Sequence, residues 1–177
     1  MITRIRRVGS ILLIKWWSWR FRKHCSSAGH DLSVLGPCEV SGEGTIVVGN
    51  GLVIRSRTFN RVEMSVAASA RLELGDRVFL NQGVRIACCV GITIGDNTLI
   101  GDETVILDND YHGVGGSSAK VSPVRIESDV WIATRVIVLR GVTIGQGSAI
   151  GAGSVVTKSI PPRVFAAGVP ARVIKAI

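Results

Sequence analysis

The sequence has few aromatic residues, few cysteines and no cysteine pair with metal-ligand spacing. Phe, Trp and Tyr make up 5% of the 177 residues although 46% are hydrophobic, so Ile, Val and Leu must supply most of the core. The four cysteines show no Cys-x-x-Cys spacing, which argues against a structural zinc site. Cys88 and Cys89 are adjacent and would form only a strained pair, so a reduced, cytoplasmic chain is the simpler interpretation.

A long hydrophobic run is also missing. The first 24 residues are rich in Ile, Leu and Trp, but Lys15 interrupts them, so the apolar stretch is too short to span a bilayer. Apolar side chains recur there at helical spacing: Ile5, Val8, Leu12, Trp16 and Trp19. We therefore expect a helix over residues 1–24. A secretory signal is disfavoured because no clean small-x-small cleavage site follows.

Acidic residues are absent before Asp31, whereas the expected helix carries seven basic side chains: Arg4, Arg6, Arg7, Lys15, Arg20, Arg22 and Lys23. A basic helix with tryptophans can lie on an anionic membrane, which would place a cytoplasmic protein peripherally at the inner face of the membrane. Alternatively, the helix caps the end of the fold or contacts another subunit. The net charge of +8 and the pI of about 10.0 favour an anionic partner. Nucleic acid is not expected, because no reading motif is present and the basic residues concentrate near the termini.

Residues 126–156 repeat every six residues. An aliphatic side chain occupies every sixth position, in the order Ile126, Ile132, Val138, Ile144, Ile150 and Val156. Neither a helical period nor strand alternation produces this spacing, whereas six-residue repeats are typical of a parallel β-helix. Each repeat supplies a short strand and a bend, three repeats close a triangular coil, and stacked coils bury an aliphatic core. The pattern therefore predicts an all-β solenoid.

The same period divides the chain into segments. It is loose over residues 25–60, clear from Leu74 onward, and interrupted between Ile106 and Ile126. We predict a β-helix domain over residues 25–160 with a polar loop protruding at residues 108–123. A short tail over residues 161–177 follows, because prolines stop regular strand pairing. Polar loops on rigid scaffolds are common locations for function.

Residues 74–177 resemble the hexapeptide-repeat acyltransferases. The resemblance rests on residues 130–133, 141–145, 150–158 and 167–172, which are similar to the galactoside and maltose O-acetyltransferase branch. The basic start is more like acetyltransferases of polysaccharide and lipopolysaccharide assembly. The resemblance implies a left-handed parallel β-helix, a homotrimer, acetyl-CoA bound between neighbouring prisms, and transfer of acetyl to a hydroxyl of a sugar or glycan precursor.

The resemblance also implies roles for individual residues. His112 lies in the expected loop, one position displaced from the family's catalytic histidine, and we expect it to be the general base that removes the hydroxyl proton. Asn81 matches an asparagine that contacts the acceptor or the thioester region. Asp108 and Asp110 are both candidates for orienting the imidazole at the substrate site. A solvated loop histidine and an asparagine that only supports its corner are the alternatives.

Another set of residues matches family positions that line the coenzyme A groove: Thr134, Ala152, Thr157, Lys158, Arg172 and Lys175. A small residue such as Ala152 leaves room for the pantetheine arm along a strand edge. The three cations would bind the phosphates. Ala133 stands where glycine is usual, and Lys175 where arginine is common. Acetyl-CoA is therefore the expected co-substrate, and no metal is expected.

Other functions remain open at this point. N-acetylation of an amino sugar would use the same coenzyme, and a non-catalytic trimeric scaffold would need no site at all. A zinc hydratase needs several histidines, and only His112 lies in the repeat region. A covalent route through an acetylated Cys88 or Cys89 lacks a histidine adjacent in sequence.

Overall fold

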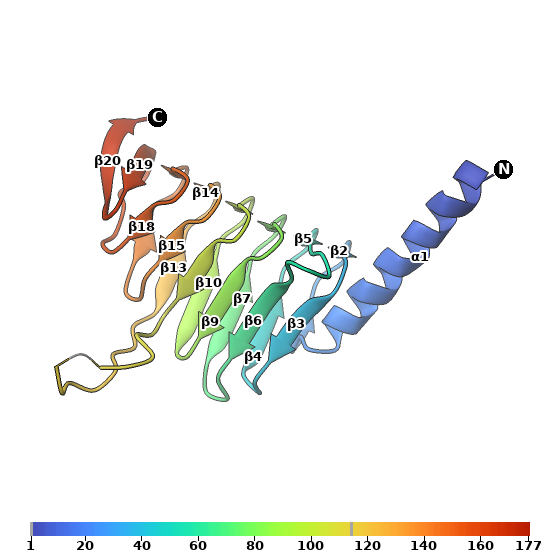
Figure 1. Cartoon of the computed structure of the whole chain (residues 1–177), viewed down its shortest axis with the longest axis horizontal. Helices are drawn as coiled ribbons and strands as arrows, with labels where there is room; N and C mark the ends of the chain where they lie inside the picture. Colours follow the sequence, from blue (N-terminus) through green and yellow to red (C-terminus); the bar gives the residue numbers. More distant parts are fainter. Residues whose placement is uncertain (1, 114) are drawn as a thin grey trace.

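The chain is a triangular solenoid with one helix at its N-terminal end (Figure 1). The structure is a computed structural model that describes residues 2–113 and 115–177, with side chains from residue 11 onward. Helix α1 (Ile2–Arg22) precedes a series of short strands. The side chains of Arg4, Arg6 and Arg7 lie outside the described part.

Three parallel sheets form the walls of the prism. Sheet A contains β1 (Ser27–Ala28), β4 (Thr45–Val48), β7 (Arg71–Leu74), β10 (Gly91–Ile94), β13 (Val124–Ile126) and β16 (Thr143–Ile144). Sheet B contains β2 (Ser33–Leu35), β5 (Val53–Arg55), β8 (Phe79–Leu80), β11 (Leu99–Ile100), β14 (Trp131–Ile132), β17 (Ala149–Ile150), β19 (Val164–Gly168) and β20 (Ala171–Ala176). Sheet C contains β3 (Cys38–Ser41), β6 (Val62–Val66), β9 (Arg85–Cys88), β12 (Val105–Leu107), β15 (Ile137–Val138) and β18 (Val155–Val156).

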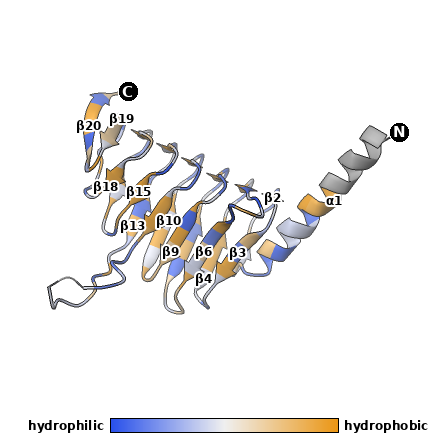
Figure 2. Cartoon of the chain, in the orientation of Figure 1, coloured by the Kyte–Doolittle hydropathy of each residue, from blue (hydrophilic) through white to orange (hydrophobic). Residues whose placement is uncertain are grey.

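The strand register explains the six-residue period. Along sheet B, Leu80, Ile100, Ile132 and Ile150 pair in succession, and each is at most 1% exposed. The residue before each of these points outward, and in sheet C the outward residues are often hydrophilic, so that Glu63 and Ser65 alternate with buried apolar residues along β6 (Figure 2). Burial of each such aliphatic side chain contributes about 1.5–3 kcal/mol before entropy costs. The prediction of an all-β, left-handed parallel β-helix is confirmed.

The coils extend further toward the N-terminus than the clear repeat. Although the six-residue pattern is loose over residues 25–60, β1 to β6 form two full turns of the prism. Their corners are longer or differently spaced, and residues 56–61 form a small hairpin closed by Arg57 and Asn60. The period fails there because corner length changes, while the inward positions stay aliphatic, as Ile46, Ile54 and Met64 show.

Each end of the solenoid is covered. At the N-terminal end, Phe21 of α1 is buried and the Ser18 hydroxyl accepts the Val34 N–H at 3.0 Å. At the C-terminal end, β19 pairs with β17 in parallel and with β20 in the antiparallel sense. Within the described residues, no helix is both long and apolar enough to cross a membrane.

Candidate functional site

Three corners connect the walls, and they differ in regularity. The corner between sheets A and B and the corner between sheets B and C are short in most coils. The corner between sheets C and A carries the long loop at residues 108–123, which leaves β12 and returns at β13 (Figure 1). Sheet C therefore has a plain corner on one side and a protruding loop on the other.

Asp108 holds the base of this loop. Its side chain is buried and its two oxygens accept three backbone N–H groups of the neighbouring coil, from Cys89, Val90 and Gly91, at 2.7–2.8 Å. The Asn109 amide also lies 3.4 Å from one Asp108 oxygen. The carboxylate thus faces the coil beneath the loop, and these contacts fix where the loop begins.

His112 lies in a polar hollow of the loop. The hollow has a volume of about 390 Å³ and is lined by Asp110, His112, Gly113, Ser117, Ser118, Lys120 and Arg140. The His112 N–H donates to the Asp110 carbonyl at 2.6 Å, which is a tight turn. Arg140 Nε lies 2.6 Å from Asp110 Oδ1, so the two side chains form an ion pair. The Nε–H bond of Arg140 does not point at that oxygen, so the contact is not a hydrogen bond. The Asp110 carboxylate is therefore engaged with Arg140 of the next coil.

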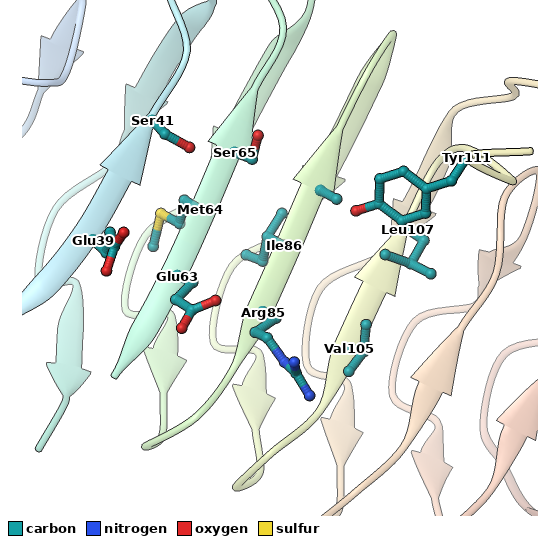
Figure 3. Close-up of a pocket in the computed structure, with 11 residues that line it drawn as sticks. Glu39, Ser41, Glu63, Met64, Ser65, Arg85, Ile86, Val105, Leu107 and Tyr111 are labelled. Carbon is teal, nitrogen blue, oxygen red and sulfur yellow. The ribbon is translucent and has the colours of Figure 1, made fainter. Parts of the chain in front are cut away.

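The outer surface of sheet C forms a groove of about 420 Å³ beside this loop (Figure 3). One outward row runs along the paired strands as Glu39, Glu63, Arg85 and Val105, and it continues as Ile137 and Val155. The first three side chains are charged and the rest are apolar. Tyr111 of the loop leans over the far edge of the same groove. Sheet C thus offers a polar half near α1 and an apolar half near the C-terminus.

Asn81 and His112 lie at opposite edges of sheet C. Asn81 belongs to the corner that enters β9, where its Oδ1 accepts the Gln82 N–H at 3.0 Å. His112 follows the end of β12, after the strand has crossed the wall. A strand of four residues spans on the order of 13 Å, so one protomer does not bring these two side chains together.

The six residues expected at the coenzyme groove lie in three pairs, two of them on or next to sheet B and one at the far edge of sheet C. Thr134 and Ala152 lie on stacked corners between sheets B and C, where the Gly153 N–H donates to the Thr134 carbonyl at 2.9 Å. Arg172 and Lys175 lie on β20, paired with Ala167 and Phe165 of the adjacent strand. Thr157 and Lys158 lie across the wall, on the corner between sheets C and A. Ala152, Lys158, Arg172 and Lys175 are exposed.

The cysteines offer neither a metal site nor an activated thiol. No cluster of three metal-ligating side chains occurs among the described residues. Burial raises the pKa of the Cys88 thiol to about 12, with the negative charge of Asp108 adding to the effect. Burial and Asp108 also raise the pKa of Cys89. Both thiols stay protonated at neutral pH, which disfavours a covalent acetyl-cysteine route.

Comparisons with known proteins identify the family. The model for "Bacterial transferase hexapeptide (six repeats)" matches residues 123–158. The putative lipopolysaccharide biosynthesis O-acetyl transferase WbbJ of Escherichia coli K12 is 34% identical over 156 residues, which cover 78% of this chain and 76% of that protein. The chain belongs to the hexapeptide-repeat transferase family.

Two further relatives are informative. The galactoside O-acetyltransferase of E. coli K12 is 40% identical over 112 residues, which are 61% of this chain but only 55% of that protein. A hexapeptide-repeat acetyltransferase from Vibrio cholerae, solved in complex with acetyl coenzyme A, is 28% identical with a TM-score of 0.63, covering 88% of this chain and 73% of that one. The predicted membership of the hexapeptide-repeat acyltransferases is confirmed.

In this hexapeptide-repeat transferase, sequence reasoning missed several site residues. Glu63, Arg85 and Tyr111 line the sheet C groove, and Arg140 contacts Asp110. A signal for the first two was present, because Glu63 and Arg85 alternate with the inward Met64 and Ile86. Recognising that they are neighbours requires the register between β6 and β9, which the loose early repeat obscured.

Proposed function

We propose that the protein transfers an acetyl group from acetyl-CoA to a hydroxyl of a sugar, in the assembly of a glycan or lipopolysaccharide. The observation that carries the proposal is His112, held in a polar hollow at the one long interruption of the repeat region. The names of the relatives support acetyl transfer, and two of them are O-acetyltransferases. The co-substrate follows from the acetyl-CoA complex of the V. cholerae neighbour.

In the proposed reaction His112 acts as general base. An imidazole nitrogen takes the proton of the acceptor hydroxyl while its oxygen attacks the thioester carbonyl. The tetrahedral intermediate then collapses, the carbon–sulfur bond breaks, and the imidazolium returns the proton to the leaving thiolate. Products are the acetyl ester and free coenzyme A, with no net change in the enzyme. Asp108 and Asp110 contribute by holding the loop, through the Cys89–Gly91 backbone and Arg140.

The proposed site is shared between copies in a homotrimer. Sheet B carries an outward apolar row that includes Phe79, Leu99 and Trp131, of which Leu99 is 46% and Trp131 57% exposed. The later part of sheet C is also apolar, whereas sheet A carries Thr, Arg and Glu. Two apolar walls per subunit suit a closed ring, in which each copy uses a different wall toward each neighbour.

A shared site also accounts for the separated residues. In the proposed trimer, the edge of sheet C that carries His112 in one subunit and the opposite edge that carries Asn81 in the next subunit line the same cleft. Thr134, Ala152, Arg172 and Lys175 would then line one side of the coenzyme groove, and Thr157 and Lys158 of the neighbour the other. The exposed cations among them suit the phosphates of coenzyme A.

The polar half of the sheet C groove is the proposed place for the acceptor. Glu63 and Arg85 offer an acceptor and a donor for hydroxyl groups, and Tyr111 offers an aromatic edge. Glu39 and Glu63 also favour a second candidate, N-acetylation of an amino sugar, because carboxylates attract an ammonium group. Release of free thiol from acetyl-CoA, measured against a panel of matched hydroxyl and amino sugars, distinguishes the two. No release with any sugar contradicts both.

Subunit complementation tests the shared site. Asn81→Ala and His112→Ala chains are each expected to have little activity. When they are refolded together, about a quarter of the sites in randomly mixed trimers would combine an intact Asn81 with an intact His112. Recovery of activity on mixing supports the shared site, and sedimentation should give a trimer. No recovery, or a stable active monomer, contradicts it, and full activity of Asn81→Ala alone removes Asn81 from the site.

A further inference from the structure

Helix α1 has two different faces, and only one of them contacts the solenoid. Trp17, Ser18 and Phe21 face the first coil: Phe21 is 2% exposed, Trp17 packs against the core, and Ser18 bonds to Val34. Arg22 joins this contact by donating to the carbonyls of Ala28 and Gly29 at 2.9 and 2.7 Å. These residues explain how the helix caps the prism.

The opposite face carries an exposed apolar stripe, which meets the capping face only where the Trp16 ring contacts that of Trp17, at 4.4 Å between ring centres, among the described residues. Leu12, Trp16 and Trp19 follow one another at spacings of four and three, which places them on one side of the helix. They are 62%, 45% and 53% exposed. The N-terminal part of α1 extends away from the end of the solenoid (Figure 1), so the first coil covers only the C-terminal part of the helix.

Cations frame the stripe. Lys15, Arg20 and Lys23 are exposed beside it, with Lys23 Nζ 3.7 Å from the centre of the Trp19 ring and the Arg20 guanidinium 5.7 Å from that of Trp16. No acidic residue precedes Asp31 in the sequence, so nothing within the helix neutralises this charge. Tryptophans that bury in an interface, next to lysines and arginines that pair with anionic head groups, are the chemistry of a helix lying on a membrane surface.

We infer that the outward face of α1 docks the protein on an anionic lipid surface, while its inward face caps the solenoid. Capping and docking are then simultaneous, because they use opposite sides of one helix. The inference does not depend on the reaction that the site performs. It places the solenoid next to the bilayer, where a lipid-linked acceptor would be available.

Vesicle co-sedimentation of the full chain tests the inference. We expect binding to vesicles that contain phosphatidylglycerol, weak binding to pure phosphatidylcholine, and a decrease as salt is raised. Leu12→Ala/Trp16→Ala/Trp19→Ala should reduce the binding constant by at least tenfold, with an unchanged circular dichroism spectrum and melting temperature. Preserved folding is expected because Leu12, Trp16 and Trp19 lie outside the core, and the edge contact of Trp16 with Trp17, at 4.4 Å between ring centres, leaves Trp17 itself packed against the first coil.

Two triple variants that each remove three positive charges test whether binding depends on the cations of α1 or on the net charge of the whole protein. Lys15→Ser/Arg20→Ser/Lys23→Ser should weaken binding about 100-fold, since each charge near the surface contributes roughly fivefold. Arg57→Ser/Arg77→Ser/Arg125→Ser removes the same charge from exposed positions on the prism and should have little effect. Equal losses in both variants, equal binding to neutral vesicles, or full binding by the apolar triple variant would overturn the inference. Salt-independent self-association that disappears in the apolar variant would instead assign the stripe to a second copy of the chain.

Discussion

The corner between sheets A and B and the corner between sheets C and A both redirect the chain from one wall to the next, but they are built differently. The first repeats the same side-chain contacts from coil to coil. Asn50 N–H donates to Asp76, Asp76 N–H donates to Asp96, and Asp96 N–H donates to the Ser128 hydroxyl. The second shows no such ladder in the part that the structure describes, and at residues 108–123 it opens into a loop.

The two corners show where repetition ends. In the ladder, the side chains of Asp76, Asp96 and Ser128 each accept a backbone N–H of the preceding coil, so these groups are engaged in stacking the coils. At the loop, Asp108 makes the equivalent contacts to the preceding coil, helped by the Asn109 amide, which donates to the Ala87 carbonyl at 3.4 Å, and the chain after them leaves the stack. His112, Lys120 and Arg140 consequently gather in a hollow. Regular corners stack the coils, and we propose that the irregular one supplies the side chains for chemistry.

Replacing a histidine at each corner should give the largest contrast. His112→Ala is expected to lower kcat by roughly 100-fold to 10,000-fold, the usual loss of general acid–base help. The melting temperature and the affinity for acetyl-CoA should hardly change, because the loop lies outside the core. His30→Ala, at the regular corner, should leave kcat unchanged. Thiol release under saturating acetyl-CoA measures both, and full activity of His112→Ala would mean that another group removes the proton.

Removing the carboxylate that anchors the loop should have the second-largest effect. Asp108→Ala removes a buried carboxylate and leaves three partly buried backbone N–H groups without their acceptor, which should cost about 3 kcal/mol of unfolding free energy in urea titrations. We expect a further loss of kcat, since His112 is placed by this loop. Asp96→Ala, which removes one exposed acceptor from the ladder, should cost less and leave kcat intact. Similar effects of both variants would show that the corners are equivalent.

The sequence predicted the parts of this comparison that depend on repetition. Ile126, Ile132 and Val138 determine the prism because inward positions return every six residues whatever the corners contain. The loop at residues 108–123 could be predicted as an interruption of that period. The contacts of Asp108 and Asp110 could not, since the first lies against the preceding coil and the second against Arg140 of the next. Such contacts depend on stacking register, and periodicity does not specify corner side chains.

Replacing the cations proposed to hold coenzyme A, Lys158 at the corner between sheets C and A and Arg172 on β20, should have smaller effects, confined to binding. Lys158→Ala and Arg172→Ala are each expected to raise the KM for acetyl-CoA about tenfold with little change in kcat, because phosphate contacts act alike in ground and transition states. Arg125→Ala, on the outer face of sheet A, is the matched control and should change neither constant. A lower kcat with an unchanged KM in Lys158→Ala would move that residue from the coenzyme groove to the reacting centre.

The smallest effect is expected from the ladder itself, and only in acid. The backbone N–H of Asn50 holds the pKa of Asp76 below its ordinary value. Hydrogen bonds from the side chains of Gln146 and then Asn97 lower the pKa of Asp129.

A carboxyl whose pKa is lower in the folded state binds its proton more readily when the chain is unfolded. Its contribution to stability is therefore complete above the unfolded pKa, near 4, and is lost as the pH falls through the folded value. Asp129 is exposed and Asp76 is partly exposed, so water and salt screen the effect. The melting temperature of the native protein should fall between pH 5 and pH 3 by slightly more than that of Asp76→Asn/Asp129→Asn, while kcat at neutral pH is the same for both. An equal acid dependence of the two proteins would mean that the charges of Asp76 and Asp129 do not stabilise the fold, and that the ladder acts only through its hydrogen bonds.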